Sequence, residues 1–339
     1  MSYDAKEIWF YSPEVSTPQI RQAIEKFWKA WLPMHSTSVD LPLYHYTTLE
    51  GLKGIIRNRS IWFTHTSTLN DPTELIYGKQ LILNQLNNEL NKNHEEIIVK
   101  FLHALIDEIN RFDKIMYETY VACFRESDNL LSQWRGYAHR GGGYNLGFSF
   151  TSDIKFYQTL DNIEKDSHII LRKIIYKEND QNQLIADYIT SILSYAGDAI
   201  KYFQSHGGIP EIWELMAAME SANILCDLML SFKNPVFIEE NEWRLILVRQ
   251  PEHKANQLKF RENEKLLIPY IETFIIEQIE GKSFFPLRSI KFGPMLDVLS
   301  TRSALKLFIS KESAAESTVN INANGVRITD AGYKLRGYN

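Results

Sequence analysis

The chain has 339 residues, of which 44% are hydrophobic and 12% aromatic, so it can bury a core in one large domain or two smaller ones. Its formal net charge of −5 argues against a broad electrostatic footprint for nucleic acid but leaves room for a local basic patch. Two cysteines, Cys123 and Cys226, supply no disulfide framework, and no apolar run approaches the roughly 20 residues that span a bilayer. The first thirty residues carry no secretion signal, so we expect a cytoplasmic protein with no membrane partner.

An amphipathic helix is predicted near the start of the chain. Apolar side chains recur at helical spacing from Gln19 to Trp31, and Pro33 ends the pattern. We therefore expect residues 1–40 to form an N-terminal helical extension. Residues 41–335 contain no internal repeat, low-complexity tract or clear linker, which favours a single α+β domain over two independent domains.

Residues 41–75 predict the order strand, helix, strand, helix. Leu41–Tyr46 is rich in aromatic and aliphatic residues, as in a short strand, and Thr47 opens a capping box for the helix that follows. Ile61–Thr64 is expected to form the next strand. Asp71 then has the position of a second helix cap, with a proline at the first helical residue.

Polar and aromatic side chains gather where the first two predicted strands end. His45 and Tyr46 lie at the end of the first strand. Trp62, Phe63 and His65 lie on the second strand, which we expect to neighbour the first in the sheet. The candidate site is therefore sought around this part of the chain.

Further helices and strands are predicted from the spacing of apolar residues. Helical insertions are expected near 75–112 and 183–230, where apolar residues recur at helical intervals. The tail alternates on both sides of Asn324-Gly325, which predicts a two-residue hairpin. Strands are expected where apolar and polar residues alternate or where an apolar run is short; these are 116–124, 144–150, 169–176, 238–248, 265–275 and 287–292.

The stretch 238–248 carries acidic residues into a buried strand. With a period of two, Glu240, Glu242 and Arg244 share one face, and the aliphatic run after them implies a buried position in the sheet. A carboxylate in such a strand must be paired, because an unpaired buried charge is costly. Glu242 is therefore interpreted either as half of an ion pair, with Arg244 or a lysine, or as part of a site.

Several common site motifs are absent from the sequence, among them a P-loop, a dinucleotide-binding glycine motif, a paired-cysteine zinc motif and an HExxH helix. His65, Asp71 and Glu74 could together hold a metal ion, although their spacing matches no standard template. A metal-dependent hydrolase or nuclease is therefore an alternative function.

Six stretches, taken in order, carry a resemblance to a known family: YHYTTLEGLKGI, IWFTHTSTLNDPTE, ACFRESDNLLSQWRGYA, GYNLGFSF, ENEWRLI and IKFGP. Across residues 41–335 the chain resembles an uncharacterised bacterial family, the domain-of-unknown-function family 2971. That family is in turn similar to the ADP-ribosyltransferase superfamily. The resemblance implies an α+β fold with a split pair of small mixed sheets that hold NAD. It also implies an enzyme that cleaves the nicotinamide–ribose bond and transfers ADP-ribose to an unknown acceptor.

The resemblance implies a set of residues that contact NAD. His45 matches the first-strand histidine that hydrogen-bonds the adenosine ribose, although His45 taken alone also fits a core histidine. Tyr46 and Thr47 would bring backbone groups near the nicotinamide amide. Trp62 or Phe63 matches the aromatic side chain that packs on the nicotinamide ring.

Glu242 matches the catalytic glutamate of the superfamily, and Glu240 lies two positions earlier on the same face. Cleavage of the nicotinamide–ribose bond develops positive charge on the ribose, and a fixed carboxylate stabilises that charge. We therefore expect the Glu242 carboxylate and the His45 ring to face one cleft, on adjacent or nearby strands of the same sheet system.

Two further pairs of residues are assigned to NAD, each with an alternative beside it. Asn70 and Asp71 match the family, but helix capping also explains them. Trp134 and Arg135 would meet the pyrophosphate, since arginine makes bidentate contacts with phosphate. A buried tryptophan and a surface arginine are the alternative for this pair.

The company that such bacterial families keep suggests a toxin or a phage-defence effector, with an inhibitor or antitoxin as its partner. NAD would be the substrate, and no metal is expected in the reaction. A non-catalytic descendant of the fold, which only senses a nucleotide, is a further alternative.

Overall fold

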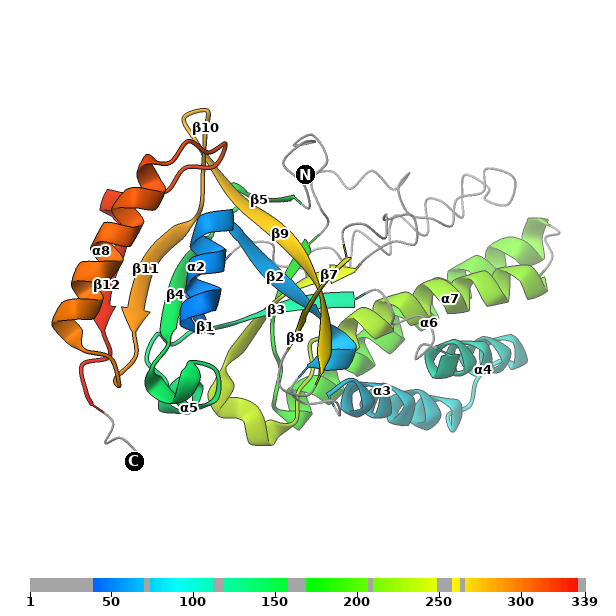
Figure 1. Cartoon of the computed structure of the whole chain (residues 1–339). Coiled ribbons are helices and arrows are strands. Elements are labelled where there is room, and N and C mark those ends of the chain that lie inside the picture. Colours follow the sequence, from blue (N-terminus) through cyan, green and yellow to red (C-terminus); the bar gives the residue numbers. More distant parts are fainter. Residues whose placement is uncertain are drawn as a thin grey trace. The chain divides into compact units, whose positions relative to one another are not determined.

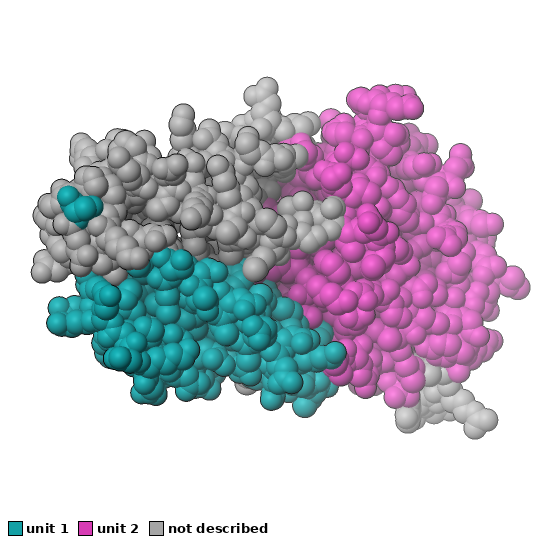
Figure 2. Space-filling model, turned by 180° about the vertical axis from the view of Figure 1, so that it is seen from behind, with its two compact units in different colours: residues 1–35, 71–116, 175–236 teal, residues 36–70, 117–174, 237–339 magenta. Residues whose placement is uncertain are grey.

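The computed structural model describes residues 39–69, 74–111, 119–157, 169–206, 210–248, 258–262 and 266–334 (Figure 1). Residues 1–38 of the predicted N-terminal extension therefore lie outside the described residues. The chain divides into two compact units, shown in different colours in Figure 2. The first comprises residues 1–35, 71–116 and 175–236, and the second comprises residues 36–70, 117–174 and 237–339. The predicted helical insertions contribute their residues to the first unit.

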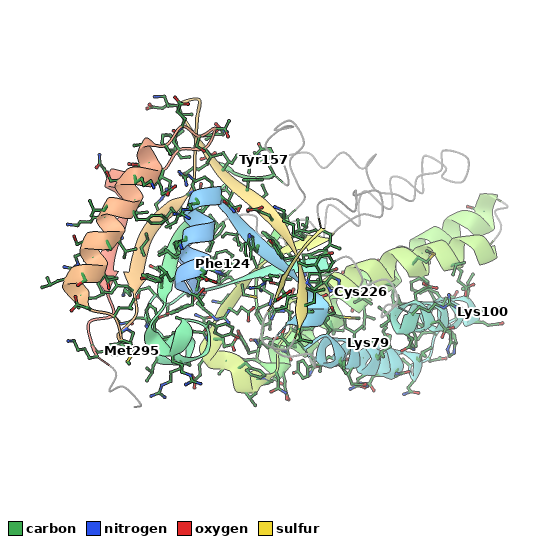
Figure 3. The ribbon with its side chains drawn as sticks, viewed as in Figure 1. Lys79, Lys100, Phe124, Tyr157, Cys226 and Met295 are labelled. Atoms are coloured by element: carbon green, nitrogen blue, oxygen red, sulfur yellow. The ribbon has the colours of Figure 1, made fainter. Side chains whose placement is uncertain are left out.

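The first unit is helical. Its long helices are α3 (Glu74–Leu90), α4 (Glu96–Arg111), α6 (Glu178–His206) and α7 (Pro210–Met229), so both predicted insertions are confirmed as helical. Their apolar faces form one core, which includes Phe101 and Cys226, the latter labelled in Figure 3. Gly78 allows α3 to approach the end of α7 closely, because a Cβ atom at this position would lie only 2.9 Å from the Met229 carbonyl oxygen.

The second unit contains a mixed sheet, to which twelve strands of the described residues belong. The principal order is β10-β9-β2-β3-β1-β4-β11-β12, with β5 and β8 on β9 and with β6 joined through β7 to β3. The α+β class is thereby confirmed. The strands are β1 (Val39–Thr47), β2 (Ser60–His65), β3 (Thr119–Arg125), β4 (Tyr144–Phe150), β5 (Ile154–Tyr157), β6 (Ile169–Lys173), β7 (Glu242–Val248), β8 (Leu258–Glu262), β9 (Leu267–Ile279), β10 (Lys282–Phe284), β11 (Leu287–Phe292) and β12 (Arg327–Asp330).

Strand β3 has one continuous edge and one divided edge. Along the first edge β7 pairs with its whole length, from Thr119 to Arg125. Along the other edge β2 pairs with Tyr120 and Val121, whereas β1 pairs with Arg125. The two strands β1 and β2 therefore separate beside Cys123, and they are not neighbours of each other as the sequence had predicted.

The core of the second unit lies on the face of the sheet that α2 (Leu49–Asn58) and α8 (Val298–Ala314) cover (Figure 1). Phe124 of β3, labelled in Figure 3, is fully buried there. Its ring meets Phe148 and Phe150 edge to face, with centroids 5.9 and 5.0 Å away. Such pairs stabilise a core beyond the apolar area that they bury.

Three details of the sequence prediction are corrected. Thr48, not Thr47, is the N-cap of α2, because Thr47 is still paired in β1 and the Thr48 hydroxyl accepts from the Gly51 amide. Strand β7 begins only at Glu242, because Pro235–Glu240 forms the 3-10 helix η7. No hairpin forms at Asn324-Gly325, which lies in a short 3-10 turn, because β12 pairs with β11 in parallel.

Arg59 ends α2 and connects it to α8. Its φ of 57° is left-handed, a conformation that is uncommon for a residue with a Cβ atom. The buried guanidinium donates from Nη2 to the Glu312 carbonyl at 2.6 Å and from Nε to the Val319 carbonyl at 3.3 Å. Arg59 thus satisfies a carbonyl in the last turn of α8, which would otherwise have no donor within the helix.

We predict that Arg59→Ala lowers the free energy of unfolding by about 2–4 kcal/mol, because it leaves buried carbonyls without their charged donor. Arg57→Ala is the matched control, since Arg57 is about half exposed and its ion pair with Glu312 spans 3.5 Å. The control should cost at most about 1 kcal/mol. Urea unfolding of both variants measures the difference, and equal losses would contradict a special role for Arg59.

Among the described residues, no helix is both long enough and apolar enough to cross a membrane.

Candidate functional site

Glu242, the predicted catalytic residue, is the first residue of β7 and is 1% exposed. Its Oε1 atom lies 2.6 Å from Nε of Arg244, and its Oε2 atom lies 3.4 Å from Nη1 of Arg125. The three side chains share a face, because Arg125 and Glu242 pair in register and Arg244 lies two residues further on. The ion pair with Arg244 that was one interpretation of the sequence is therefore present.

Glu240 also pairs with Arg125, but it lies outside strand β7. It is the last residue of η7 and not part of β7, which corrects the predicted strand position. Asn241 turns the chain between the two acids with a left-handed φ of 40°. Nη2 of Arg125 donates to Oε2 of Glu240 at 2.8 Å, so the two carboxylates converge on one guanidinium.

The electrostatics of this cluster favour charged arginine and a neutral thiol. Burial disfavours the charged form of Arg125, but the carboxylates of Glu242 and Glu240 hold its pKa above the ordinary value. Burial raises the pKa of the Cys123 thiol, and the charge of Glu242 raises it further. Burial and the charge of Glu242 therefore favour the neutral thiol of Cys123 over the nucleophilic thiolate.

His45 lies where β1 and β2 separate on the divided edge of β3. Its Nδ1 is 2.9 Å from the Cys123 carbonyl oxygen, and its ring centroid is 5.6 Å from that of Phe124. Burial lowers the pKa of His45, and the positive charges of Arg125 and Arg261 lower it further. A carbonyl only accepts, so Nδ1 of the neutral ring carries the proton and Nε2 is left as an acceptor.

The structure thus brings His45 and Glu242 to the same short stretch of β3 from its two edges. His45 contacts the carbonyl of Cys123, and Glu242 pairs in register with Arg125. His45 and Glu242 therefore lie on nearby strands of one sheet. The ring of His45 packs against Phe124, whose side chain points to the opposite face of β3 from Arg125 and Glu242, so the cleft that the two residues were expected to share stays a prediction.

Of the two predicted aromatic residues, only Trp62 presents its ring at the surface. Trp62 is 36% exposed and stacks on Tyr270 at a centroid distance of 4.4 Å, with Arg261 5.9 Å from the indole centroid. Phe63 is fully buried in the core, because successive side chains of β2 point to opposite faces. Phe63 is therefore a packing residue.

Tyr46 and Trp134 form a small buried cluster around the loop after β3. The Tyr46 hydroxyl accepts from the Leu130 amide at 2.8 Å and donates to the Ser127 carbonyl at 3.1 Å, and burial raises the pKa of Tyr46 to about 12. Trp134 is fully buried, packs edge-on against Tyr46 and donates from Nε1 to Asn129 at 2.9 Å. The structural alternative for Trp134 therefore holds.

The remaining predicted site residues are Thr47, Arg135, Asn70 and Asp71. Thr47 is the last residue of β1, and Arg135 is exposed on the short helix α5 (Leu131–Gly136). Asn70 and Asp71 lie outside the described residues. Within the described ranges, no group of histidine, cysteine, aspartate and glutamate has an arrangement that could hold a metal ion.

Sequence reasoning missed Arg125, Glu126 and Arg261. Arg125 and Glu126 stand in the stretch ACFRESDN at the end of a predicted strand, where they could have been considered as partners for the acids. No local signal marks Arg261, because its approach to Trp62 depends on the pairing of β8 with β9 and of β9 with β2.

The lowered pKa of His45 predicts a pH-dependent stability. As the pH falls through the ordinary histidine value of 6.5, the unfolded chain takes up a proton that the folded chain resists, so stability decreases. His45→Gln lacks this contribution, and its difference in unfolding free energy from the wild type should therefore shrink between about pH 7.5 and pH 5.5. Urea unfolding across this range measures the effect, and a constant or growing difference would refute it.

Comparison with known proteins identifies one relationship. No curated protein and no solved structure gave a match to the chain. One family model matches residues 133–245, a region that runs from α5 to the start of β7 and includes Glu242 but not His45 or Trp62. The family is described as "Protein of unknown function (DUF2971)", so the resemblance to that uncharacterised family is confirmed.

Proposed function

We propose that this chain is an NAD-dependent ADP-ribosyltransferase-like enzyme that cleaves the nicotinamide–ribose bond and transfers ADP-ribose to an acceptor. The observation that supports the proposal best is that His45 and Glu242 lie on β1 and β7, the strands that flank the same end of β3. One approaches from the divided edge of that strand and the other from its continuous edge. Action in the cytoplasm, as a toxin or phage-defence effector under the control of an inhibitor, belongs to the same proposal.

The chemistry of the side chains suits parts of NAD. Neutral His45 offers Nε2 as an acceptor for a ribose hydroxyl. Trp62 offers a partly exposed indole, which is a flat apolar partner for the nicotinamide ring. Glu242 supplies a fixed negative charge, which stabilises the positive charge that develops on the ribose as nicotinamide leaves.

The pairing of Glu242 sets a condition on this mechanism. Both of its oxygens face arginines, and the residue is 1% exposed. For Glu242 to act on the ribose, Arg125 has to turn away from it when substrate binds. Glu240, whose side chain is 15% exposed, then keeps Arg125 paired.

We predict that Glu242→Gln lowers kcat for nicotinamide release by about 10²–10³ while NAD still binds, because the variant keeps the shape and loses the charge. Glu277→Gln is the control for the loss of a buried ion pair, since Glu277 is 6% exposed and pairs with Arg288 at 2.6 Å. Nicotinamide release and melting temperature are measured for both. A stable Glu242→Gln protein with undiminished release would rule out the mechanism.

His45→Ala should have a different kinetic signature. Because His45 is assigned to the adenosine ribose and not to the bond that breaks, its loss should raise KM for NAD and leave kcat nearly unchanged. Steady-state kinetics separate the two parameters. A fall in kcat with an unchanged KM would contradict the assignment.

A second candidate function is non-catalytic sensing of a nucleotide, and the buried, doubly paired state of Glu242 favours it. In that case Glu242 is a structural residue. Titration calorimetry would detect tight binding of NAD or ADP-ribose, and product analysis would detect no nicotinamide. Activity that is lost with a chelator and restored by magnesium or zinc would instead favour a metal-dependent hydrolase.

A further inference from the structure

Glu126 accepts hydrogen bonds from the turn residue that separates the two acids of the cluster and from the strand that follows this turn. Its Oε1 atom accepts from Nε1 of Trp243 at 2.8 Å and from Nζ of Lys173 at 2.6 Å. Its Oε2 atom accepts from Nδ2 of Asn241. Two of the three donors therefore belong to the turn at Asn241 or to the residue that follows Glu242.

The position of Glu126 next to Arg125 explains how the turn is held. The Arg125 side chain lies on the face of the sheet that carries Glu242, because the two residues pair in register. Trp243 follows Glu242 in β7, so its indole lies on the opposite face, where it meets Glu126. Two consecutive residues at the end of β3 thus contact this region from opposite faces of the sheet. Arg125 pairs with the two acids, and Glu126 accepts from Asn241 and Trp243.

The turn at Asn241 brings the two carboxylates to the same guanidinium. In a regular strand, residues two apart are separated by about 7 Å along the chain and project in parallel. Here the left-handed Asn241 breaks that spacing, and both Glu240 and Glu242 reach the Arg125 guanidinium. A left-handed φ is uncommon for residues with a Cβ atom, but asparagine adopts it more readily than most, and the Asn241 side chain is held by Glu126.

The negative charge of Glu126 allows its carboxylate to accept these three hydrogen bonds. Its burial opposes ionisation, but the hydrogen bonds from Lys173, Trp243 and Asn241 outweigh burial and hold the pKa of Glu126 below the ordinary glutamate value. The carboxylate therefore remains an acceptor at neutral pH, as three donors require.

We propose that Glu126 is a positioning residue, which fixes the turn at Asn241 and thereby orients Glu242 toward the ribose of NAD. The catalytic part of this inference rests on the proposed function. The structural part, that Glu126 orders the turn, stands on the contacts alone.

The test compares two variants that loosen the turn with two that do not. Glu126→Gln replaces one acceptor oxygen with an amide that faces the donors, and Asn241→Ala removes the hydrogen bond that the Asn241 side chain donates to Glu126. Lys173→Ala removes the donor whose side chain is 52% exposed, together with its contact over the Trp243 ring, and Glu277→Gln removes a buried carboxylate elsewhere in the sheet. All four are made in the full-length chain.

Hydrogen exchange of the peptide that covers residues 237–243 is the first readout. We expect faster exchange in Glu126→Gln and Asn241→Ala, and wild-type exchange in Lys173→Ala and Glu277→Gln. Unchanged exchange in Glu126→Gln would overturn the proposal, whatever the activity of the enzyme.

Kinetics of nicotinamide release are the second readout. The two loosened variants should lose at least about 10-fold in kcat with KM for NAD nearly unchanged, because displacement of a catalytic group by about 1 Å can cost 10²-fold. The two controls should keep kcat within about threefold, since neither removes a hydrogen bond between Glu126 and residues 241–243. If Glu277→Gln lowered kcat in proportion to its loss of melting temperature, the loss of kcat in Glu126→Gln would be explained by lost stability. That outcome would contradict a positioning role for Glu126.

The role of Glu126 in ordering the turn and its role in positioning Glu242 can be disproved independently. If the wild-type protein releases no nicotinamide, the proposed function and the catalytic role of Glu126 fall together, and the exchange data still decide whether Glu126 orders the turn. If the wild type is active and only the exchange changes, Glu126 orders the turn without positioning Glu242 for catalysis.

Discussion

The Arg125 guanidinium is the charge on which much of this site depends. It is 4% exposed and lies between the carboxylates of Glu240 and Glu242. Removing one partner of a buried ion pair leaves the other charge without compensation, at a typical cost of about 3–5 kcal/mol. The sheet must therefore deliver both acids to this one residue. That requirement explains why β7 begins where it does and why a left-handed residue precedes it.

The division of one edge of β3 is the second constraint. Where β1 and β2 separate, the Cys123 carbonyl would have no strand partner on that side, and a buried carbonyl without a donor is costly. His45 supplies the donor from its ring. The same histidine thus satisfies the sheet and keeps one nitrogen available as an acceptor. A structural role and a ligand-binding role for His45 are therefore compatible.

Burial has opposite consequences for the two ends of the proposed site. On the divided edge it keeps His45 neutral, which suits a group that accepts a hydrogen bond from a hydroxyl. On the other edge it encloses Glu242 between arginines, which suits a structural ion pair better than an open catalytic group. The proposed chemistry therefore requires movement at Arg125, whereas a sensor of the same fold would not.

Local patterns in the sequence were sufficient to predict most helices and several strands. The apolar stripe of α2, the long helices of the first unit and the alternation of β4 all depend on residues a few positions apart, whose spacing is visible in the chain. The pairing of Glu242 with Arg244 was also foreseeable, because the two share a face of one strand. The role of Arg125 was not, since no local pattern relates it to residues more than a hundred positions away.

Tertiary structure alone decided which strands are neighbours and how the acids are held. β3 lies between β1 and β2 although it follows them by more than fifty residues, and β12 pairs in parallel with β11 where Asn324-Gly325 had suggested a hairpin. The burial of Phe63 and Trp134, which the sequence left open as ligand contacts, likewise follows from packing between distant segments. Helix caps and periodicity arise from interactions within a few residues and so can be read in the sequence. Strand order, the turn at Asn241 and its attachment to Glu126 arise from contacts between segments that only folding brings together.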